Sequence, residues 1–261
     1  TVRLGQAPEP DSMWIGTNNG LVLRTPDGTL EVLDAEDGLS DSNIWIQCHD
    51  KLGRVWFNAS SKLGVLTFAG TKIPKGFPDN KSLTVAGKQA TLSLKSWEGP
   101  RGYSCFAETL ESQEPELPNR EAVCFSGARH IECWTDDGAW TILGKEHGLV
   151  VDSNIQSLLL LEDGHLLAGS EAQGIFQSTV PLGNLLNRAG YQIFTNKASS
   201  FKAVWGPSTG APTGDVEYML LRKGMLWVGT DKGVLKIDPK DMSLKGSVTT
   251  EEGLPDNFSV S

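Results

Sequence analysis

The chain of 261 residues carries a formal net charge of −9 and contains 29 glycines and 13 prolines between short apolar runs. This length fits one large β domain or two ordinary domains, and no apolar run is long enough for a transmembrane helix. The acidic balance disfavours nucleic acids and anionic membranes as partners, because both are bound through basic surfaces.

The predicted elements begin with a short edge strand, because Val2 and Leu4 alternate with polar residues. A hairpin follows over residues 13–24, in which Trp14 stands in an apolar strand and a polar pair before Gly20 forms a tight turn. The same pattern of apolar residue, Trp, apolar residue, Gly-Thr, two polar residues and Gly returns at residues 226–238. Two near-copies at opposite ends of one chain predict a repeat.

Three further copies lie between these two hairpins, and they become more degenerate in the middle of the chain. The residues at the Trp position are Trp14, Trp56, Cys124, Leu167 and Trp227. Their alternation with apolar neighbours favours packing between sheets over ligand contact for the three tryptophans.

A second signature, a Gly-Leu loop ending in polar residues, leads into apolar strands at 44–48, 155–161 and 258–260. Where it is missing, loops that place Trp beside Gly-Pro stand in its place, at 97–103 and 205–215. The unit is therefore four antiparallel strands in roughly forty to fifty residues, which is the period of a β-propeller blade.

These units predict an all-β fold, a single β-propeller domain over residues 1–261 with five four-stranded antiparallel blades. The strand at 258–260 is expected to pair with residues 13–16 and close the ring. Two alternatives remain open: a sixth, motif-poor blade at 71–97, or a piece of a longer propeller.

The two signatures together resemble the two-component regulator propeller repeat family. The match is good around residues 37–56 and 226–238, fair at 148–174 and poor at 82–134, and it departs at Asn58 and Cys124. The resemblance implies a bacterial sensor module of a hybrid two-component system that responds to glycan fragments in the periplasm or outside the cell.

Four cysteines are present, and no CxxC pair exists that would indicate zinc. Cys124 and Cys133 flank a turn symmetrically, so they are expected opposite each other on a hairpin, either as a disulfide or as buried thiols. Cys48 and Cys105 are expected on the first strands of neighbouring blades, reduced and buried.

The chain lacks the GxGxxG, P-loop, GxSxG and HExxH motifs, so neither a cofactor nor a metal is expected. Asp50 is interpreted as a carboxylate that caps a turn. Carboxylates that a glycosidase mechanism would need are present, but the sequence does not give the distances between them. They are Glu146, Asp152, Glu171, Asp215, Glu217 and Asp256.

Ligand contacts are expected from the loops that feed the first strand of each blade, because these loops vary in length and carry the insertions. The candidate ligand-binding residues are Asp41, Asn43, Trp97, Arg101, Tyr103, Asp152, Asn154, Trp205 and Asp215. Trp97 and Trp205 either stack on a sugar ring or pack between blades. The opposite turns, at 51–53, 162–164 and 222–224, are expected to leave little room for a pocket.

Three functions follow as alternatives. The first is a non-catalytic, sensor-type propeller that binds a small polar ligand such as an oligosaccharide at the channel mouth. The second is a hydrolase or lyase that acts on a glycan with carboxylates at that mouth. The third is a scaffold that binds other protein domains.

Overall fold

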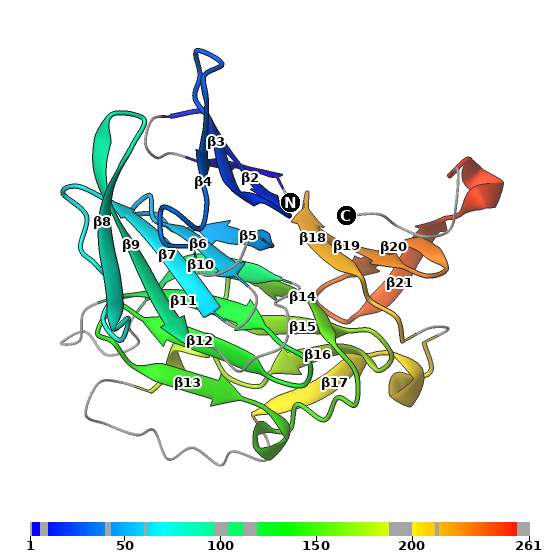
Figure 1. Ribbon diagram of the computed structural model, residues 1–261. Helices are drawn as coiled ribbons and strands as arrows, with labels where there is room; N and C mark the ends of the chain where they lie inside the picture. The colour runs from blue at the N-terminus through cyan, green and yellow to red at the C-terminus, as the bar shows by residue number, and fades with distance from the viewer. Residues whose placement is uncertain are drawn as a thin grey trace.

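The computed structural model describes residues 2–5, 10–39, 43–59, 62–96, 104–111, 119–187, 200–211 and 214–254. These residues form five antiparallel sheets arranged around a centre, with the first strands of the sheets toward the middle (Figure 1). This radial arrangement is that of a β-propeller. Among the described residues, no helix is long and apolar enough to span a membrane.

The five sheets follow one another along the chain, and each is named by its place in that order. Sheet 1 contains β1 (Val2–Gly5), β2 (Ser12–Thr17), β3 (Gly20–Arg24) and β4 (Leu30–Leu33). Sheet 2 contains, in spatial order, β5 (Ile44–His49), β6 (Val55–Ala59), β7 (Lys62–Phe68), β9 (Lys88–Ser96) and β8 (Asp79–Val85). Sheet 3 contains β10 (Cys105–Leu110), β11 (Arg120–Ser126), β12 (Ile131–Thr135) and β13 (Trp140–Leu143).

The last two sheets are built in the same order. Sheet 4 contains β14 (Ile155–Leu160), β15 (Leu166–Ser170), β16 (Gly174–Ser178) and β17 (Phe201–Trp205). Sheet 5 contains β18 (Tyr218–Arg222), β19 (Met225–Thr230), β20 (Gly233–Asp238) and β21 (Ser243–Val248). Short 3₁₀ turns follow some of the strands: η1 (Lys145–His147), η2 (Leu182–Asn184), η4 (Pro207–Thr209) and η5 (Thr250–Glu252).

The hairpin copies fall where the repeat predicts, on the second strand of each sheet. The Trp-position residues lie on β2, β6, β11, β15 and β19. Trp14 and Trp56 are fully buried, which confirms their role as packing residues between sheets. Trp227, at the same position in sheet 5, is only half-buried.

The Gly-Thr-x-x-Gly pattern is explained by the turn between the second and third strands. The Thr17 hydroxyl donates a hydrogen bond to the carbonyl of Gly20 at 2.8 Å, and Thr230 does the same to Gly233. Gly20 has a φ of 121°, and a Cβ there would lie 2.3 Å from the Leu33 carbonyl oxygen. Only glycine fits such a turn, because a side chain would collide with the neighbouring strand.

The Gly-Leu signature forms a compact corner between sheets. The amide of Leu39 donates to the carbonyl of Asp34, and the amide of Leu149 donates to the carbonyl of Gly144. The leucine side chains are buried, so each corner is anchored in the core before the next first strand begins.

The six-bladed alternative is wrong for the described residues. Within 71–97, β8 and β9 form a hairpin whose second strand pairs with β7 along its whole length, from Lys62 opposite Ser96 to Phe68 opposite Ala90. The hairpin therefore completes sheet 2 as its two outer strands, because an open strand edge accepts a neighbour more readily than two strands form a sheet alone.

The expected ring closure by residues 258–260 is also wrong as it was stated. Those residues lie outside the described chain, but β2 already has a partner on each edge: Met13 pairs with Leu4 of β1 and with Arg24 of β3. The alternating N-terminal segment supplies the first strand of sheet 1 itself. Contact between sheets 5 and 1 remains a prediction.

The core lies between successive sheets. Apolar clusters form between sheets 1 and 2, between sheets 2 and 3, between sheets 3 and 4, and between sheets 4 and 5. Serine hydroxyls also join neighbouring first strands: Ser104 accepts from the amide of Leu158, and Ser157 accepts from the amide of Met219. The array is thus held by repeated contacts between neighbours, as in other repeat proteins.

Both cysteine pairs lie within bonding distance. Cys124 and Cys133 are opposite each other on β11 and β12, with a Cα–Cα distance of 4.1 Å and a disulfide between them. Cys48 and Cys105 form a second disulfide, with a Cα–Cα distance of 5.8 Å, so the expectation that they are reduced is wrong. Their placement on neighbouring first strands was predicted, but the sequence does not show that β5 and β10 face each other at these two positions.

Thiol counting checks this pairing. Protein produced in an oxidising compartment and denatured without reductant is expected to show no reactive thiols, and the same sample is expected to show four after reduction. Two thiols before reduction would mean that one pair does not form, and peptide mapping under non-reducing conditions would identify which.

Candidate functional site

The two ends of the sheets differ in the kind of connection between strands that lies there. At one end, called the loop end, the long connections lead into β5, β10, β14 and β18, and the tight turns join second to third strands. At the other end, called the turn end, short turns join first to second strands. The candidate ligand-binding residues that the structure describes lie at the loop end.

Five of the nine candidate ligand-binding residues fall in the described chain: Asn43, Asp152, Asn154, Trp205 and Asp215. The other four, Asp41, Trp97, Arg101 and Tyr103, lie outside the described residues. Asn43 directly precedes β5 and is half-buried, whereas Asp152 is exposed in the loop before β14.

Asn154 is held in place by the turn that follows β15. Its backbone carbonyl accepts from the amide of Glu171 at 2.9 Å, and its side-chain amide donates to the Glu171 carboxylate, also at 2.9 Å. Beside this pair, the Ser153 hydroxyl donates to the side-chain carbonyl of Gln173 at 3.0 Å. The loop before β14 is therefore fixed at three points, which orients its polar groups before any ligand arrives.

Asp215 lies in the segment that leads into β18, next to the same turn. The amide of Gly174 donates to the carbonyl of Gly214, and the amide of Val216 donates to the carbonyl of Ser170, so sheet 4 fixes the backbone on both sides of Asp215. Burial is the main cause that raises the pKa of Asp215 to about 6, and the nearby carboxylates of Glu217, Asp231 and Glu171 add to it. The Lys232 ammonium partly offsets this effect.

Five residues thus meet at the loop end between sheets 4 and 5, and we call them the acidic loop group. They are Asn154, Glu171, Asp215, Glu217 and Asp231. Glu171 links the two predicted members, since it bonds to Asn154 and raises the pKa of Asp215. The group offers carboxylate oxygens and an amide, which suit a ligand that donates hydrogen bonds, such as one rich in hydroxyl groups.

Sequence reasoning missed the placement of Glu171 and Glu217 and did not name Asp231. The hairpin repeat contained a usable signal, because Glu171 and Asp231 occupy the same position, the first turn residue after the second strand. Equivalent turn residues of neighbouring sheets share one end of a propeller, so the alignment alone predicts that they lie on the same face.

The raised pKa of Asp215 predicts a pH-dependent gain in stability for Asp215→Asn. In the wild type, the folded state binds this proton more tightly than the unfolded state, so ionisation of Asp215 weakens folding as pH rises through about 6. The variant should therefore melt at a higher temperature than the wild type at pH 7, and the difference should vanish below pH 4. Calorimetry across this range checks it, and an equal effect at all pH values would contradict the assigned pKa.

Trp205 does not face a ligand. Its side chain is 4% exposed at the end of β17 and packs with Leu167, Ile175 and Val216 between sheets 4 and 5. The stacking role is wrong for this residue, and the alternative, packing between blades, is the arrangement found. The Gly-Pro sequence after it starts η4 instead of presenting the indole ring.

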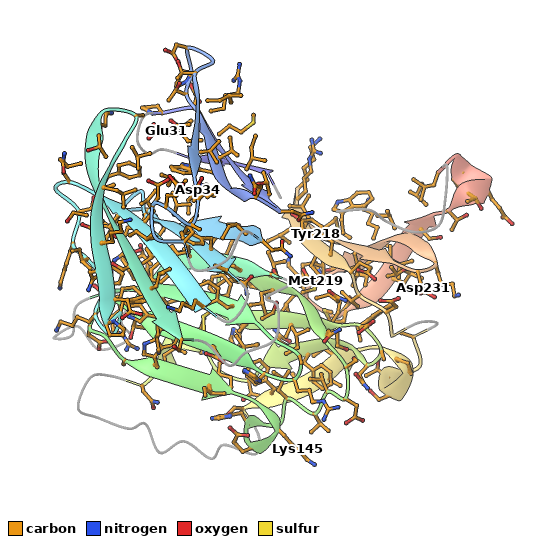
Figure 2. The ribbon with its side chains drawn as sticks, viewed as in Figure 1. Glu31, Asp34, Lys145, Tyr218, Met219 and Asp231 are labelled. Carbon is orange, nitrogen blue, oxygen red and sulfur yellow. A yellow bond between two sulfur atoms is a disulfide. The ribbon has the colours of Figure 1, made fainter. Side chains whose placement is uncertain are left out.

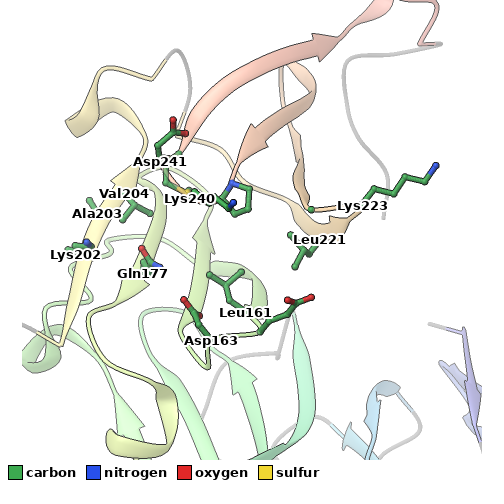
Figure 3. A pocket seen from close by; sticks show the side chains of 14 residues that line it. Leu161, Asp163, Gln177, Lys202, Ala203, Val204, Leu221, Lys223, Lys240 and Asp241 are labelled. Atoms are coloured by element: carbon green, nitrogen blue, oxygen red, sulfur yellow. The ribbon is translucent and has the colours of Figure 1, made fainter.

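The turn end contradicts the expectation that it leaves little room. A cavity of about 710 Å³ lies there between sheets 4 and 5 (Figure 3). Leu161, Val204 and Met242 form apolar parts of its wall, and Gln177, Lys202 and Asp163 contribute polar groups. Residues of the turns at 162–164 and 222–224 line it together with residues of β16, β17 and the segment 239–242, so its walls come from elements far apart in the sequence.

Two of the charged side chains in this cavity, Asp163 and Asp241, form hydrogen bonds within their own turns. Asp163 accepts from the amide of His165 and lies 3.1 Å from its ring. Asp241 accepts from Ser243, whose hydroxyl is the main cause that lowers the pKa of this carboxylate. In Figure 3 the Lys223 side chain extends away from the cavity. The acidic loop group differs in that four carboxylate side chains and one side-chain amide lie close together.

The histidines have local roles. His130 lies 2.9 Å from Glu132, and His147 accepts from the amide of Gly144 within its own turn. In the part of the chain that the structure describes, no three potential metal ligands come together.

No family model matches the chain, and no curated protein matches it. Solved structures do resemble it. One is PorZ, an essential surface component of the type-IX secretion system of Porphyromonas gingivalis, with a TM-score of 0.64 and 15% identity over 99% of this chain and 35% of that one. The fold is that of a β-propeller. Virginiamycin B lyase from Staphylococcus aureus is similar with a TM-score of 0.56 and 13% identity, over 98% of this chain and 71% of that chain.

The third structure is the extracellular domain of the putative hybrid two-component system BT4673 from B. thetaiotaomicron. It is similar with a TM-score of 0.53 and 14% identity, over 86% of this chain and 25% of that chain. The present propeller thus spans about a quarter to a third of the length of two of its structural relatives. These likenesses concern the fold, since a propeller supports sensing, catalysis and assembly alike.

Proposed function

We propose that this propeller is a non-catalytic, sensor-type ligand-binding module that recognises a small polar ligand such as an oligosaccharide at its loop end. The observation that carries the proposal is the acidic loop group, where Asn154 and Glu171 are hydrogen-bonded to each other and Asp215 is near enough for the Glu171 carboxylate to raise its pKa. Carboxylate and amide oxygens accept hydrogen bonds from sugar hydroxyls, and side chains fixed by backbone contacts lose little entropy on binding.

The location we propose is the periplasm or the cell exterior. Two disulfides are typical of proteins that fold in an oxidising compartment. The extracellular domain of the hybrid two-component system, a structural relative by fold, is consistent with this location. We propose the sensor role for this chain because of the repeat resemblance and the fold of that relative. A ligand-binding experiment tests it.

A glycan array followed by thermal shift of the full chain tests binding. A ligand present at a hundred times its Kd should raise the free energy of unfolding by about 2.7 kcal/mol, because it binds only the folded state. Glu171→Ala should weaken the binding of the same ligand, whereas Glu36→Ala, which removes an exposed carboxylate from the loop after β4, should not. Equal affinities for the two variants would contradict the site.

The second candidate is a lyase or hydrolase that acts on a glycan, and the pKa of Asp215 favours it. A carboxyl group that titrates near 6 among other carboxylates is suited to general acid–base catalysis. Incubation of a bound glycan with the chain separates the two functions. A binder returns the glycan intact, whereas an enzyme releases new chain ends at a rate that follows the ionisation of Asp215 and is lost in Asp215→Asn.

A further inference from the structure

The turn-end cavity between sheets 4 and 5 has an apolar floor. Leu161, Val204 and Met242 are only partly buried, and they pack against the apolar cluster between the two sheets. The floor is therefore the open end of that cluster. At about 710 Å³, the cavity has the size of a small-molecule site, and a molecule bound there shields apolar surface from water.

The inner end of the cavity, toward the first strands, carries carboxylates. Glu162 and Asp163 are in the turn that follows β14, and both side chains are exposed. Lys223, in the corresponding turn of sheet 5, extends away from the cavity (Figure 3). The inner end therefore favours a cationic group on a ligand.

The outer end of the cavity carries lysines. Lys202 is on β17 and Lys240 follows β20, and neither ammonium makes an ion pair with another described residue. Asp241 is at the same end, but it accepts hydrogen bonds from Ser243, and Lys245 Nζ lies 4.0 Å from its carboxylate. The outer end therefore favours an anionic group on a ligand.

The distance between the two ends follows from the strand order of sheet 4. The strands β14, β15, β16 and β17 are successive neighbours. Three steps of about 4.8 Å place the first strand about 14 Å from the fourth. An extended peptide advances about 3.3–3.6 Å per residue, so about four residues span this distance. Gln177, directly opposite Lys202 on β16, also lines the cavity and offers an amide to a peptide group.

We propose that the turn-end cavity binds a short peptide of about four apolar residues with free ends. The peptide ammonium lies at Glu162 and Asp163, its carboxylate lies at Lys202 and Lys240, and its side chains pack on the apolar floor. A neutral oligosaccharide has neither end charge, so this site takes a different class of ligand from the one proposed at the loop end.

Isothermal titration calorimetry of the full chain with the peptides Ala-Val-Ala-Leu and Leu-Val-Ala-Phe tests the proposal. We expect one peptide bound per chain. N-terminal acetylation and C-terminal amidation should each weaken binding by about two- to fivefold, because each removes one ion pair at an exposed position. The dipeptide Ala-Leu should bind more weakly than either, since it reaches only one end of the cavity.

Variants assign the two ends of the peptide. Lys202→Gln combined with Lys240→Gln should weaken binding of the free peptide but not of the amidated one, in which the carboxylate is already absent. Glu162→Gln should likewise weaken binding of the free peptide but not of the acetylated one. All three side chains are exposed, so the variants should fold.

Two matched controls carry the same substitutions at exposed positions away from the cavity. Lys145→Gln, on η1, and Glu36→Gln, in the loop after β4, should bind the free peptide like the wild type (Figure 2). Hydrogen–deuterium exchange with the peptide should slow at 161–164, 202–204 and 239–242 and stay unchanged at 171–174 and 214–217.

Four outcomes would overturn the proposal. No binding of either tetrapeptide at millimolar concentration excludes a peptide site. Equal affinities for free and capped peptides mean that the end charges are not recognised. A loss in Lys145→Gln equal to that in the lysine pair means that only net charge matters. Slower exchange confined to 171–174 and 214–217 would place the peptide at the loop end.

Discussion

Replacement of Asp50 by Ala is expected to lower the free energy of unfolding by about 3–5 kcal/mol, because it leaves a buried arginine without its counter-charge. Asp50 follows β5 and is buried. One of its carboxylate oxygens accepts from the amides of Leu52 and Arg54, each at 3.0 Å, and the other accepts from Arg54 Nε and from Trp56 Nε1.

Arg54 is equally buried, with 1% of each of the two side chains exposed. Its guanidinium lies 5.4 Å from the Trp56 ring centroid and 5.1 Å from the Trp134 ring centroid, between sheets 2 and 3. The prediction that Asp50 caps a turn is therefore confirmed, but the turn is joined to a charged core that the sequence did not predict.

Urea unfolding of Asp50→Ala beside Asp163→Ala measures this effect. Asp163 also accepts a hydrogen bond from a backbone amide of its own turn, that of His165, but its side chain is mostly exposed. Asp163→Ala should therefore lower the free energy of unfolding by no more than about 1 kcal/mol. Equal losses in the two variants would mean that the buried ion pair does not stabilise the fold. Asp50→Leu combined with Arg54→Met should recover much of the loss, since no unpaired charge remains.

Trp205→Ala is expected to cost about 3–5 kcal/mol of stability, as is usual when a large buried aromatic side chain is removed. The indole is in the core between sheets 4 and 5, so its removal leaves a cavity beside Leu167 and Val216. Affinity for any ligand of the loop end should be unchanged per folded molecule, because the ring faces the core.

Denaturation and binding on this one variant separate the two roles that the sequence left open. Trp227→Ala is the matched control and should cost less, since Trp227 is half-buried. A stable Trp205→Ala variant with weakened binding would restore the stacking role and contradict the burial of the ring.

The fold was predictable from sequence because its signals are local. A Gly-Thr-x-x-Gly turn with a Trp beside it indicates one hairpin, and five copies of this hairpin pattern in order predict five sheets. The Gly-Leu corner adds the connection to the next first strand. The predictions that failed concern contacts between residues far apart in the sequence. They are the partner of β2 at its edge, the place of the β8–β9 hairpin, and the pairing of Cys48 with Cys105. Each depends on which strands become neighbours.

The site was predictable only in part for the same reason. The structure places Asn154 and Asp215 at the loop end, as the sequence predicted, because the loops feeding the first strands gather there. Their link through Glu171 depends on the distance between sheets 4 and 5, which no local pattern reports. The cavity at the turn end was missed because its walls come from several elements far apart in the sequence and not from any one turn.

Hydrogen–deuterium exchange of the full chain, with and without a glycan that binds, tests most directly whether the ligand site is at the loop end. We predict slower exchange in residues 152–155, 171–174 and 214–217, where the acidic loop group lies, and no change at 161–164 or 239–242. Protection confined to 161–164, 202–204 and 239–242 would place the ligand in the turn-end cavity and contradict the proposed site.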